Sequence, residues 1–175
     1  MIYFDNSATT LPYKEAVDSF IAVTTKYFGN PSSLHGLGAQ AEKLLAQARK
    51  QTASLLEVKE QEIFFTSGGT EGNNIAIKGA ALANQSKGKH LIVSSIEHDS
   101  IKQAAEQMKE LGFEVTYLPV TESGHVEVEA LKNEMRPDTI LVSVMHVNNE
   151  MGAIQPIEEI GKLLKEYPKT LFHVD

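Results

Sequence analysis

The stretch Ile140-Leu141-Val142-Ser143-Val144, which continues into Met145-His146-Val147-Asn148-Asn149, is the clearest indicator of the fold. Its first five residues are almost continuously apolar, which is the pattern of a strand that helices cover on both faces. Polar side chains follow at once. Four other short apolar runs also have the character of strands: 63–65, 91–93, 115–117 and 171–174.

Between these runs the apolar residues recur at three- and four-residue steps, which is the spacing of amphipathic helices. The spacing predicts helices over about 13–28, 38–56 and 101–111, each with an inward-facing apolar stripe. Gly112 is a stop signal for the last of them.

Strands and helices alternate from about residue 62 to the end. We therefore predict an α/β fold with a mostly parallel sheet flanked by helices and joined by right-handed crossovers. Ligands in such sheets bind beyond the carboxyl ends of the strands. The loops after Phe65, Val93, Val144 and Val174 are where we expect chemistry.

Composition and charge exclude several classes of function. The 175 residues include 16 basic and 23 acidic ones, a formal net charge of −7, without a basic run. We therefore expect no direct contact with nucleic acid, whose phosphates need a basic surface. The apolar stretches are far shorter than the ~20 residues that cross a bilayer, so we expect no membrane insertion. The lack of cysteine and of a secretory signal fits a cytoplasmic location.

The loop after Phe65 has the composition of an anion-binding turn. It reads Thr66-Ser67-Gly68-Gly69-Thr70-Glu71-Gly72 and leads into a helix near 75–77. Small residues and hydroxyls before a helix offer free backbone N–H groups and the positive end of the helix dipole, which suit a phosphate. A tight turn with a Ser or Thr cap explains these residues equally well, because the Walker A and dinucleotide motifs are both lacking.

Histidine and amide side chains follow two later strands. His98 could stack on a heteroaromatic ring or transfer a proton near pH 7. A surface histidine beside a capping Asp99 is the simpler interpretation of the same stretch. Asn148 and Asn149 could donate to a phenolate or a carboxylate. Because paired asparagines are also common in turns, we expect only one of them to face a ligand.

Asp175 follows the last apolar run. A carboxylate at the tip of a buried strand is costly unless a cation lies beside it, and a pyridinium nitrogen is such a cation. A cap for a following helix is the common alternative. The six histidines show no metal-ligand spacing, so we expect no metal site.

A phosphate cradle, a ring-stacking histidine, an amide donor and a carboxylate together form the protein's share of a pyridoxal phosphate site. Here the sequence closely resembles the cysteine desulfurases, of the class V aminotransferase group, in segments that occur in the family's order. The segments are Tyr3-Phe4-Asp5-Asn6-Ser7-Ala8-Thr9-Thr10, Phe28-Gly29-Asn30-Pro31-Ser32-Ser33-Leu34-His35, Phe65-Thr66-Ser67-Gly68-Gly69-Thr70-Glu71, Glu97-His98, Met145-His146-Val147-Asn148-Asn149-Glu150 and His173-Val174-Asp175.

The resemblance implies the large domain of a fold-type I enzyme that uses pyridoxal 5′-phosphate, incomplete at its C-terminus. Residues 1–12 would pack with a small domain that the chain lacks. Residues 13–175 would form part of the cofactor-binding large domain.

The resemblance also implies roles for individual residues. Gly69 and Thr70 match the family's phosphate-binding pair. His98 matches the histidine that stacks on the pyridine ring and carries out acid–base catalysis. Asn149 matches the residue near the phenolic oxygen, and Asp175 the partner of the ring nitrogen.

The activity implied is that of a cysteine desulfurase, a transferase. It converts L-cysteine to L-alanine and an enzyme-bound persulfide that supplies iron–sulfur cluster assembly or tRNA thiolation. The family forms homodimers and passes sulfur to an acceptor or scaffold protein. The Schiff-base lysine, the persulfide-forming cysteine and a substrate-binding arginine are expected downstream of Asp175. The chain is therefore expected to be a fragment that is inactive alone.

Three rival interpretations stay open. A selenocysteine lyase or another class V enzyme would use the same half. A non-catalytic dimerisation or scaffold module is a second possibility. A nucleotide-binding α/β protein is the third, and it leaves His98, Asn149 and Asp175 without a role.

Overall fold

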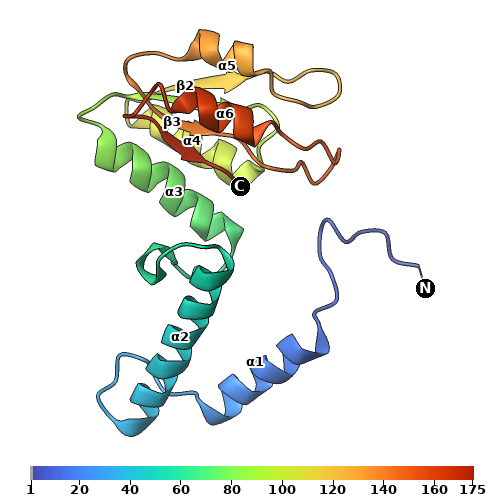
Figure 1. The fold of residues 1–175 in the computed structure, drawn as a ribbon, viewed down its shortest axis with the longest axis vertical. Coiled ribbons are helices and arrows are strands. Elements are labelled where there is room, and N and C mark those ends of the chain that lie inside the picture. The colour runs from blue at the N-terminus through green and yellow to red at the C-terminus, as the bar shows by residue number, and fades with distance from the viewer. Residues whose placement is uncertain (1) are drawn as a thin grey trace. The chain divides into compact units, whose positions relative to one another are not determined.

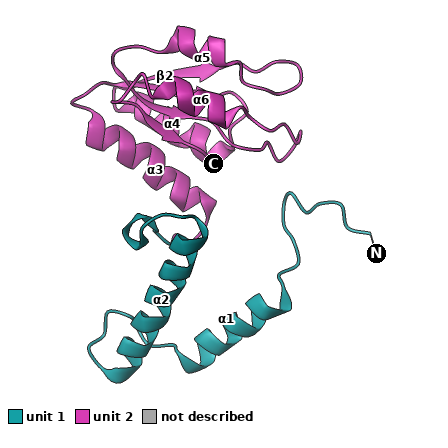
Figure 2. Ribbon diagram, viewed as in Figure 1, with its two compact units in different colours: residues 1–65 teal, residues 66–175 magenta. Residues whose placement is uncertain are grey.

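The computed structural model describes residues 2–175, which form two compact units, 1–65 and 66–175 (Figures 1 and 2). Met1, part of the predicted segment 1–12, lies outside the described residues. The predicted division into 1–12 and 13–175 concerns packing against a further domain and stays a prediction. The first unit contains three elements: α1 (Lys14–Lys26), α2 (Gly36–Leu55) and the 3₁₀ helix η1 (Glu60–Glu62).

The second unit contains the sheet and its helices. Along the chain its elements are α3 (Gly69–Asn84), β1 (His90–Ser94), α4 (Asp99–Glu110), β2 (Glu114–Leu118), α5 (Val128–Glu134), β3 (Thr139–Ser143), α6 (Ile157–Leu164) and β4 (Leu171–His173). The four strands lie in the order β2-β1-β3-β4, and every neighbouring pair is parallel. The predicted α/β fold with a parallel sheet is confirmed.

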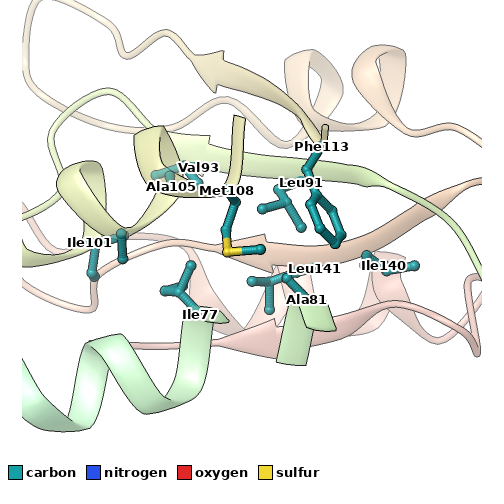
Figure 3. Packing of buried hydrophobic residues seen from close by; sticks show 11 residues of the cluster. Ile77, Ala81, Leu91, Val93, Ile101, Ala105, Met108, Phe113, Ile140 and Leu141 are labelled. Carbon is teal, nitrogen blue, oxygen red and sulfur yellow. The ribbon is translucent and has the colours of Figure 1, made fainter. Parts of the chain in front are cut away.

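The core explains why the central strands are apolar without alternation. In β1, Leu91 and Val93 belong to a cluster with residues of α3 and α4, whereas Ile92 belongs to a cluster with residues of α5 and α6. Figure 3 shows the first cluster, in which Met108 of α4 lies among β1, β3 and α3 side chains. Each face of the sheet is therefore covered by two helices, and the central strands β1 and β3 are buried along their whole length.

The strand predicted at 63–65 is wrong. The described part of unit 1 contains no strand, and the segment is irregular after η1, with Phe64 82% exposed. A strand exists only where its backbone groups pair with a neighbour, and an apolar run alone does not supply that neighbour.

The inward stripes predicted for the first two helices are also largely wrong within unit 1. Both helices form, but α1 has no buried residue, and in α2 only Gly38, Ala41 and Ala53 are buried. Helical spacing shows which residues share a face, while burial also requires an apolar surface to cover that face. In α4 the predicted stripe is buried up to Met108, whereas Leu111, just past the helix, is exposed. Gly112 follows with a φ of +83°, which confirms the stop signal.

Candidate functional site

The switch point of the sheet lies between β1 and β3. From β1 the chain passes to its neighbour β2, and it then crosses over to β3 on the other side of β1. In open α/β sheets ligands bind beyond the carboxyl ends of the strands at such a point. The loops that carry His98 and Asn149 leave the sheet here, directly after β1 and β3.

One buried carboxyl joins the ends of these two strands. Oε1 of Glu97 accepts hydrogen bonds from the Ser94 hydroxyl at 2.5 Å and from the backbone N–H of Met145 at 2.6 Å. Glu97 is 2% exposed, and its Oε2 is buried without a partner among the described residues. Burial raises the pKa of Glu97, and the nearby Asp175 acts in the same direction. Burial therefore disfavours the charged form of Glu97 relative to an exposed carboxylate.

His98 immediately precedes α4 and caps it. Its Nδ1 accepts a hydrogen bond from the backbone N–H of Ser100 at 3.1 Å and lies 2.8 Å from the Ser100 hydroxyl. A backbone N–H can only donate, so Nδ1 carries no proton in this arrangement. The neutral ring therefore has its proton on Nε2.

Asp175 lies beyond β4, where the backbone N–H of His146 donates to its carbonyl oxygen at 2.8 Å. Its Oδ2 accepts a hydrogen bond from Nδ2 of Asn73 at 3.1 Å. The same Nδ2 donates to the Ser100 hydroxyl at 3.0 Å. His98 and Asp175, which the sequence suggests only as separate candidates, are therefore joined through two intervening side chains.

The predicted phosphate pair lies at the start of α3. Gly69 and Thr70 are the first two residues of the helix, which has no side-chain cap, and Asn73 follows one turn later. One backbone donor of the preceding loop is already used, because the N–H of Ser67 donates to Oε2 of Glu71 at 2.5 Å. This hydrogen bond lowers the pKa of the Glu71 carboxyl. The loop therefore offers fewer free N–H groups than its composition suggests.

The two asparagines after β3 differ in their surroundings. Asn148 is buried: its Nδ2 donates to the Ile96 carbonyl, and its Oδ1 accepts from the N–H groups of Glu150 and Met151. Asn149 is exposed. Asn148 thus holds the turn, but both asparagines line the same cavity, so the expectation that only one of them faces a ligand stays a prediction.

A cavity of about 420 Å³ lies between the loop after β1 and the loop after β3. His98 and Asn149 both line it, together with Lys102 of α4. Gly69, Thr70 and Asp175 are not among its lining residues. The structure thus connects His98 to Asn149 by a shared cavity and to Asp175 by hydrogen bonds. Thr70 contributes no such contact and is connected to these residues only because it lies on the same helix as Asn73.

Three residues of this site escape the sequence analysis. Asn73 could have been noticed, because it lies three positions after Thr70 and so on the same face of a helix. Ser100 lies two positions after His98 and is a common type near a helix start. Glu97 stands beside His98 in a segment that carries the resemblance, but nothing there indicates that its carboxyl is buried.

Residues 2–175 contain neither a candidate membrane span nor a candidate metal site. No helix among them combines the length and apolar character needed to cross a bilayer. Across residues 2–175 there is no cluster of three or more His, Cys, Asp or Glu side chains arranged to bind a metal ion.

Comparison with known proteins gives consistent matches over the whole chain. The family model of aminotransferase class-V matches residues 2–175. A "NifS/IcsS protein homolog" of Lactobacillus delbrueckii subsp. bulgaricus is 55% identical over 175 residues, 100% of this chain and 46% of the relative. "Cysteine desulfurase IscS" of Methanosarcina thermophila is 50% identical over 99% of this chain and 43% of the relative.

Solved structures give the same result. A NifS-like protein matches with a TM-score of 0.95 at 38% identity, over 99% of this chain and 48% of the other. SspA in complex with cysteine matches with a TM-score of 0.93 at 39% identity, over 99% of this chain and 50% of the other. The chain thus spans about half the length of the proteins that it matches.

Proposed function

This chain belongs to the aminotransferase class-V family, and from that premise we propose that it forms the cofactor-binding half of a pyridoxal phosphate-dependent cysteine desulfurase. The enzyme would remove sulfur from L-cysteine, release L-alanine and keep the sulfur as a persulfide. Because the chain spans 46% of one such relative and 43% of another, the activity is proposed for the whole protein.

The observation that carries the proposal is the hydrogen-bonded connection from Asp175 to His98 beside the switch point of the sheet. The names of the relatives support the reaction class, and cysteine bound to the similar SspA supports the substrate. Homodimer formation, delivery of sulfur to an acceptor or scaffold protein for iron–sulfur clusters, and a cytoplasmic location belong to the same proposal and rest on the family resemblance.

The start of α3 fits the phosphate group. The helix has no side-chain cap, so its first N–H groups and the positive end of its dipole are not neutralised by its own N-cap side chain. A Cβ added to Gly68 or Gly69 would meet no atom within 4 Å, which shows that the space in front of the helix is open. Thr70 adds a hydroxyl donor, and we propose that Gly69 and Thr70 hold the phosphate.

The exposed carboxylate of Asp175 fits a protonated ring nitrogen. When bound, pyridoxal phosphate withdraws electrons from the substrate carbon whose bond is broken. Asp175 would keep the ring nitrogen protonated, because a carboxylate in contact favours the charged form of its partner. Asn73 holds this carboxylate in place through the 3.1 Å hydrogen bond.

His98 and Asn149 supply the other two groups. With Nδ1 of His98 occupied by Ser100, the flat face of the ring can stack on the cofactor, and Nε2 can pass a proton to or from the substrate. Asn149, which lines the same cavity, would donate to the phenolic oxygen as a neutral amide.

A chimera tests this function. Residues 1–175 would replace the matching part of the Lactobacillus delbrueckii relative, which supplies the remaining half of the enzyme. With pyridoxal phosphate, we expect alanine to form from L-cysteine, and His98→Ala to lower the rate by about 10²–10⁴-fold, the usual contribution of a general acid or base.

The unaltered relative is the positive control for the assay. A folded chimera that binds the cofactor but forms no alanine from L-cysteine would contradict the proposal.

A further inference from the structure

Four polar side chains form a continuous line across the second unit. Oδ2 of Asp175 accepts from Nδ2 of Asn73, the same amide donates to Oγ of Ser100, and Oγ of Ser100 lies 2.8 Å from Nδ1 of His98. These residues come from the end of the sheet, from α3 and from the start of α4. The two middle members are buried, with Asn73 6% and Ser100 8% exposed.

The direction of each hydrogen bond in this line follows from the chemistry of its ends. As a carboxylate, Asp175 can only accept, so Asn73 must turn its NH₂ group toward it. Nδ2 of Asn73 then donates to both neighbours, and the oxygen of Ser100 receives one of these protons. The hydroxyl proton of Ser100 is left to point at Nδ1 of His98.

The other end of the line requires the same direction. The backbone N–H of Ser100 donates to Nδ1 of His98 at 3.1 Å, and this donor cannot reverse. Nδ1 therefore receives two hydrogen bonds from one residue. A proton on Nδ1 would displace the backbone N–H and would require the Ser100 hydroxyl to turn and accept, alongside the proton it already receives from Asn73.

We propose that Asn73 and Ser100 are positioning residues, which transmit the orientation of the Asp175 carboxylate to His98 and hold its ring with the proton on Nε2. This inference deepens the proposed function and rests on it, because the proposed function gives the arrangement its purpose. Protons then enter and leave His98 at one nitrogen only. Because Nδ1 is fixed by two donors, the ring plane is fixed as well, as a ring that stacks on a flat cofactor requires.

Helix capping alone does not account for this arrangement. A cap needs only the backbone N–H of Ser100 and the His98 ring. Burying the Asn73 amide and the Ser100 hydroxyl is costly unless they are paired, and they pair with each other and with the two candidate site residues. The buried pair is explained if its task is to connect Asp175 to His98.

The first measurement is made on the unsubstituted chain without cofactor. Long-range ¹H–¹⁵N spectra of the ¹⁵N-labelled 175-residue chain, with His98→Gln used to assign the signals, report which ring nitrogen carries the proton. Above the pH range in which histidine titrates, we expect Nε2 to be protonated and Nδ1 to accept strong hydrogen bonds. A proton on Nδ1, or rapid averaging of the two nitrogens, would overturn the proposal.

Two matched substitutions then test the direction of the line. Asn73→Asp replaces the NH₂ donor by an acceptor, so the Ser100 hydroxyl should turn away from His98 and donate to the new carboxylate. The Nδ1 signal should move toward that of Ser100→Ala, which lacks the hydroxyl. Asn74→Asp is the control, because the Asn74 amide donates to the Thr70 carbonyl and lies outside the line. It should leave the His98 signals unchanged.

Unchanged His98 signals in folded Asn73→Asp and Ser100→Ala variants would refute the positioning role. If Asn73→Asp fails to fold, Ser100→Ala and the unmodified chain still decide the question. These results are independent of the chimera assay: an inactive chimera with the expected ¹⁵N spectrum refutes the proposed function alone, and an active chimera with the opposite tautomer refutes the positioning role alone.

Discussion

The backbone N–H of Met145 donates to Oε1 of Glu97 at 2.6 Å, so that one buried side chain joins the segment after β1 to the segment after β3. The two residues are 48 positions apart in sequence. Their hydrogen bond fixes the two loops that line the cavity, since His98 directly follows Glu97 and Asn149 follows Met145 by four positions. The geometry of the candidate site therefore depends on a buried carboxyl that itself lines the cavity.

Glu97→Gln should retain the connection between the two loops and remove the contribution of Glu97 to the pH dependence of the free energy of unfolding. Because burial raises the pKa of Glu97, the unfolded chain loses the proton at a lower pH than the folded chain does. The free energy of unfolding of the parent should therefore fall as the pH rises above the ordinary value near 4.5, by up to about 1.4 kcal/mol for each pKa unit between the two states. Gln keeps the acceptor oxygen and has no proton to lose.

Urea unfolding of both proteins at acidic and neutral pH measures this difference. Glu97→Gln should gain stability relative to the parent as the pH rises, whereas Glu97→Ala should lose about 1–3 kcal/mol at either pH because the Met145 N–H loses its partner. A constant difference between Glu97→Gln and the parent at all pH values would show that folding does not raise the pKa of Glu97.

His90 should make the fold sensitive to acid. Its ring is fully buried, with Nδ1 2.7 Å from Oγ1 of Thr139 and Nε2 2.9 Å from Oγ1 of Thr116. Burial lowers the pKa of His90, and the nearby Arg136 adds to this effect. The unfolded chain therefore takes up a proton at a pH where the folded chain does not, and stability is lost as the pH falls below about 6.5.

Replacement by an uncharged side chain should reduce this loss. Between about pH 7.5 and 5.5, on either side of the ordinary histidine pKa, the free energy of unfolding should fall less steeply for His90→Gln than for the parent. His125→Gln, at an exposed position, is the control and should keep the slope of the parent. Equal slopes for all three proteins would contradict the prediction.

Ile77 should contribute strongly to stability. It is 0% exposed and lies in the cluster between α3, α4 and the sheet, whereas Ile75 on the same helix is 59% exposed. Ile77→Ala should lower the free energy of unfolding by about 2–5 kcal/mol through lost burial and a residual cavity. Ile75→Ala should stay within about 0.5 kcal/mol of the parent. Chemical denaturation of both variants measures this, and similar losses would show that the described core is misassigned.

Replacing Gly88 and Gly79 by alanine should change the stability of the fold in opposite directions. A Cβ at Gly88 would lie 2.1 Å from the backbone oxygen of Asp138, the same oxygen that accepts the N–H of His90 at the start of β1. Gly88→Ala should therefore push the starts of β1 and β3 apart and cost about 1–3 kcal/mol. A Cβ at Gly79 meets nothing within 4 Å in the interior of α3, so Gly79→Ala should stabilise by about 0.5–1 kcal/mol. Thermal melts of the two variants should therefore shift in opposite directions, and a shift in the same direction would contradict the described packing.

The sheet could be predicted from sequence because its signal is local. Leu91, Ile92 and Val93 must all be apolar when helices cover both faces, and the structure shows that arrangement. The run at 63–65 is equally apolar and forms no strand, because pairing depends on a neighbour that the run itself does not specify. The buried stripe predicted for α1 is absent for the same reason, because the spacing of apolar residues does not reveal which surface covers a helix.

The candidate site was predictable only in part. Each of His98, Asn149 and Asp175 follows a strand, so their common edge follows from the topology of a parallel sheet. Their connection does not, because Asn73 reaches Ser100 across 27 positions and Asp175 across 102 positions. Such contacts are decided by the packing of α3 against α4, which periodicity does not encode.

The central claim is that Asp175 acts as the electrostatic partner of the cofactor ring, and one comparison in the chimera tests it most directly. Alanine formation from L-cysteine would be measured for the parent chimera, for Asp175→Asn, and for Asp138→Asn, an exposed carboxylate beside the start of β3. We expect Asp175→Asn to bind pyridoxal phosphate yet to lose at least about 10²-fold in rate, while Asp138→Asn keeps the parent rate. Equal rates for Asp175→Asn and the parent would contradict the account.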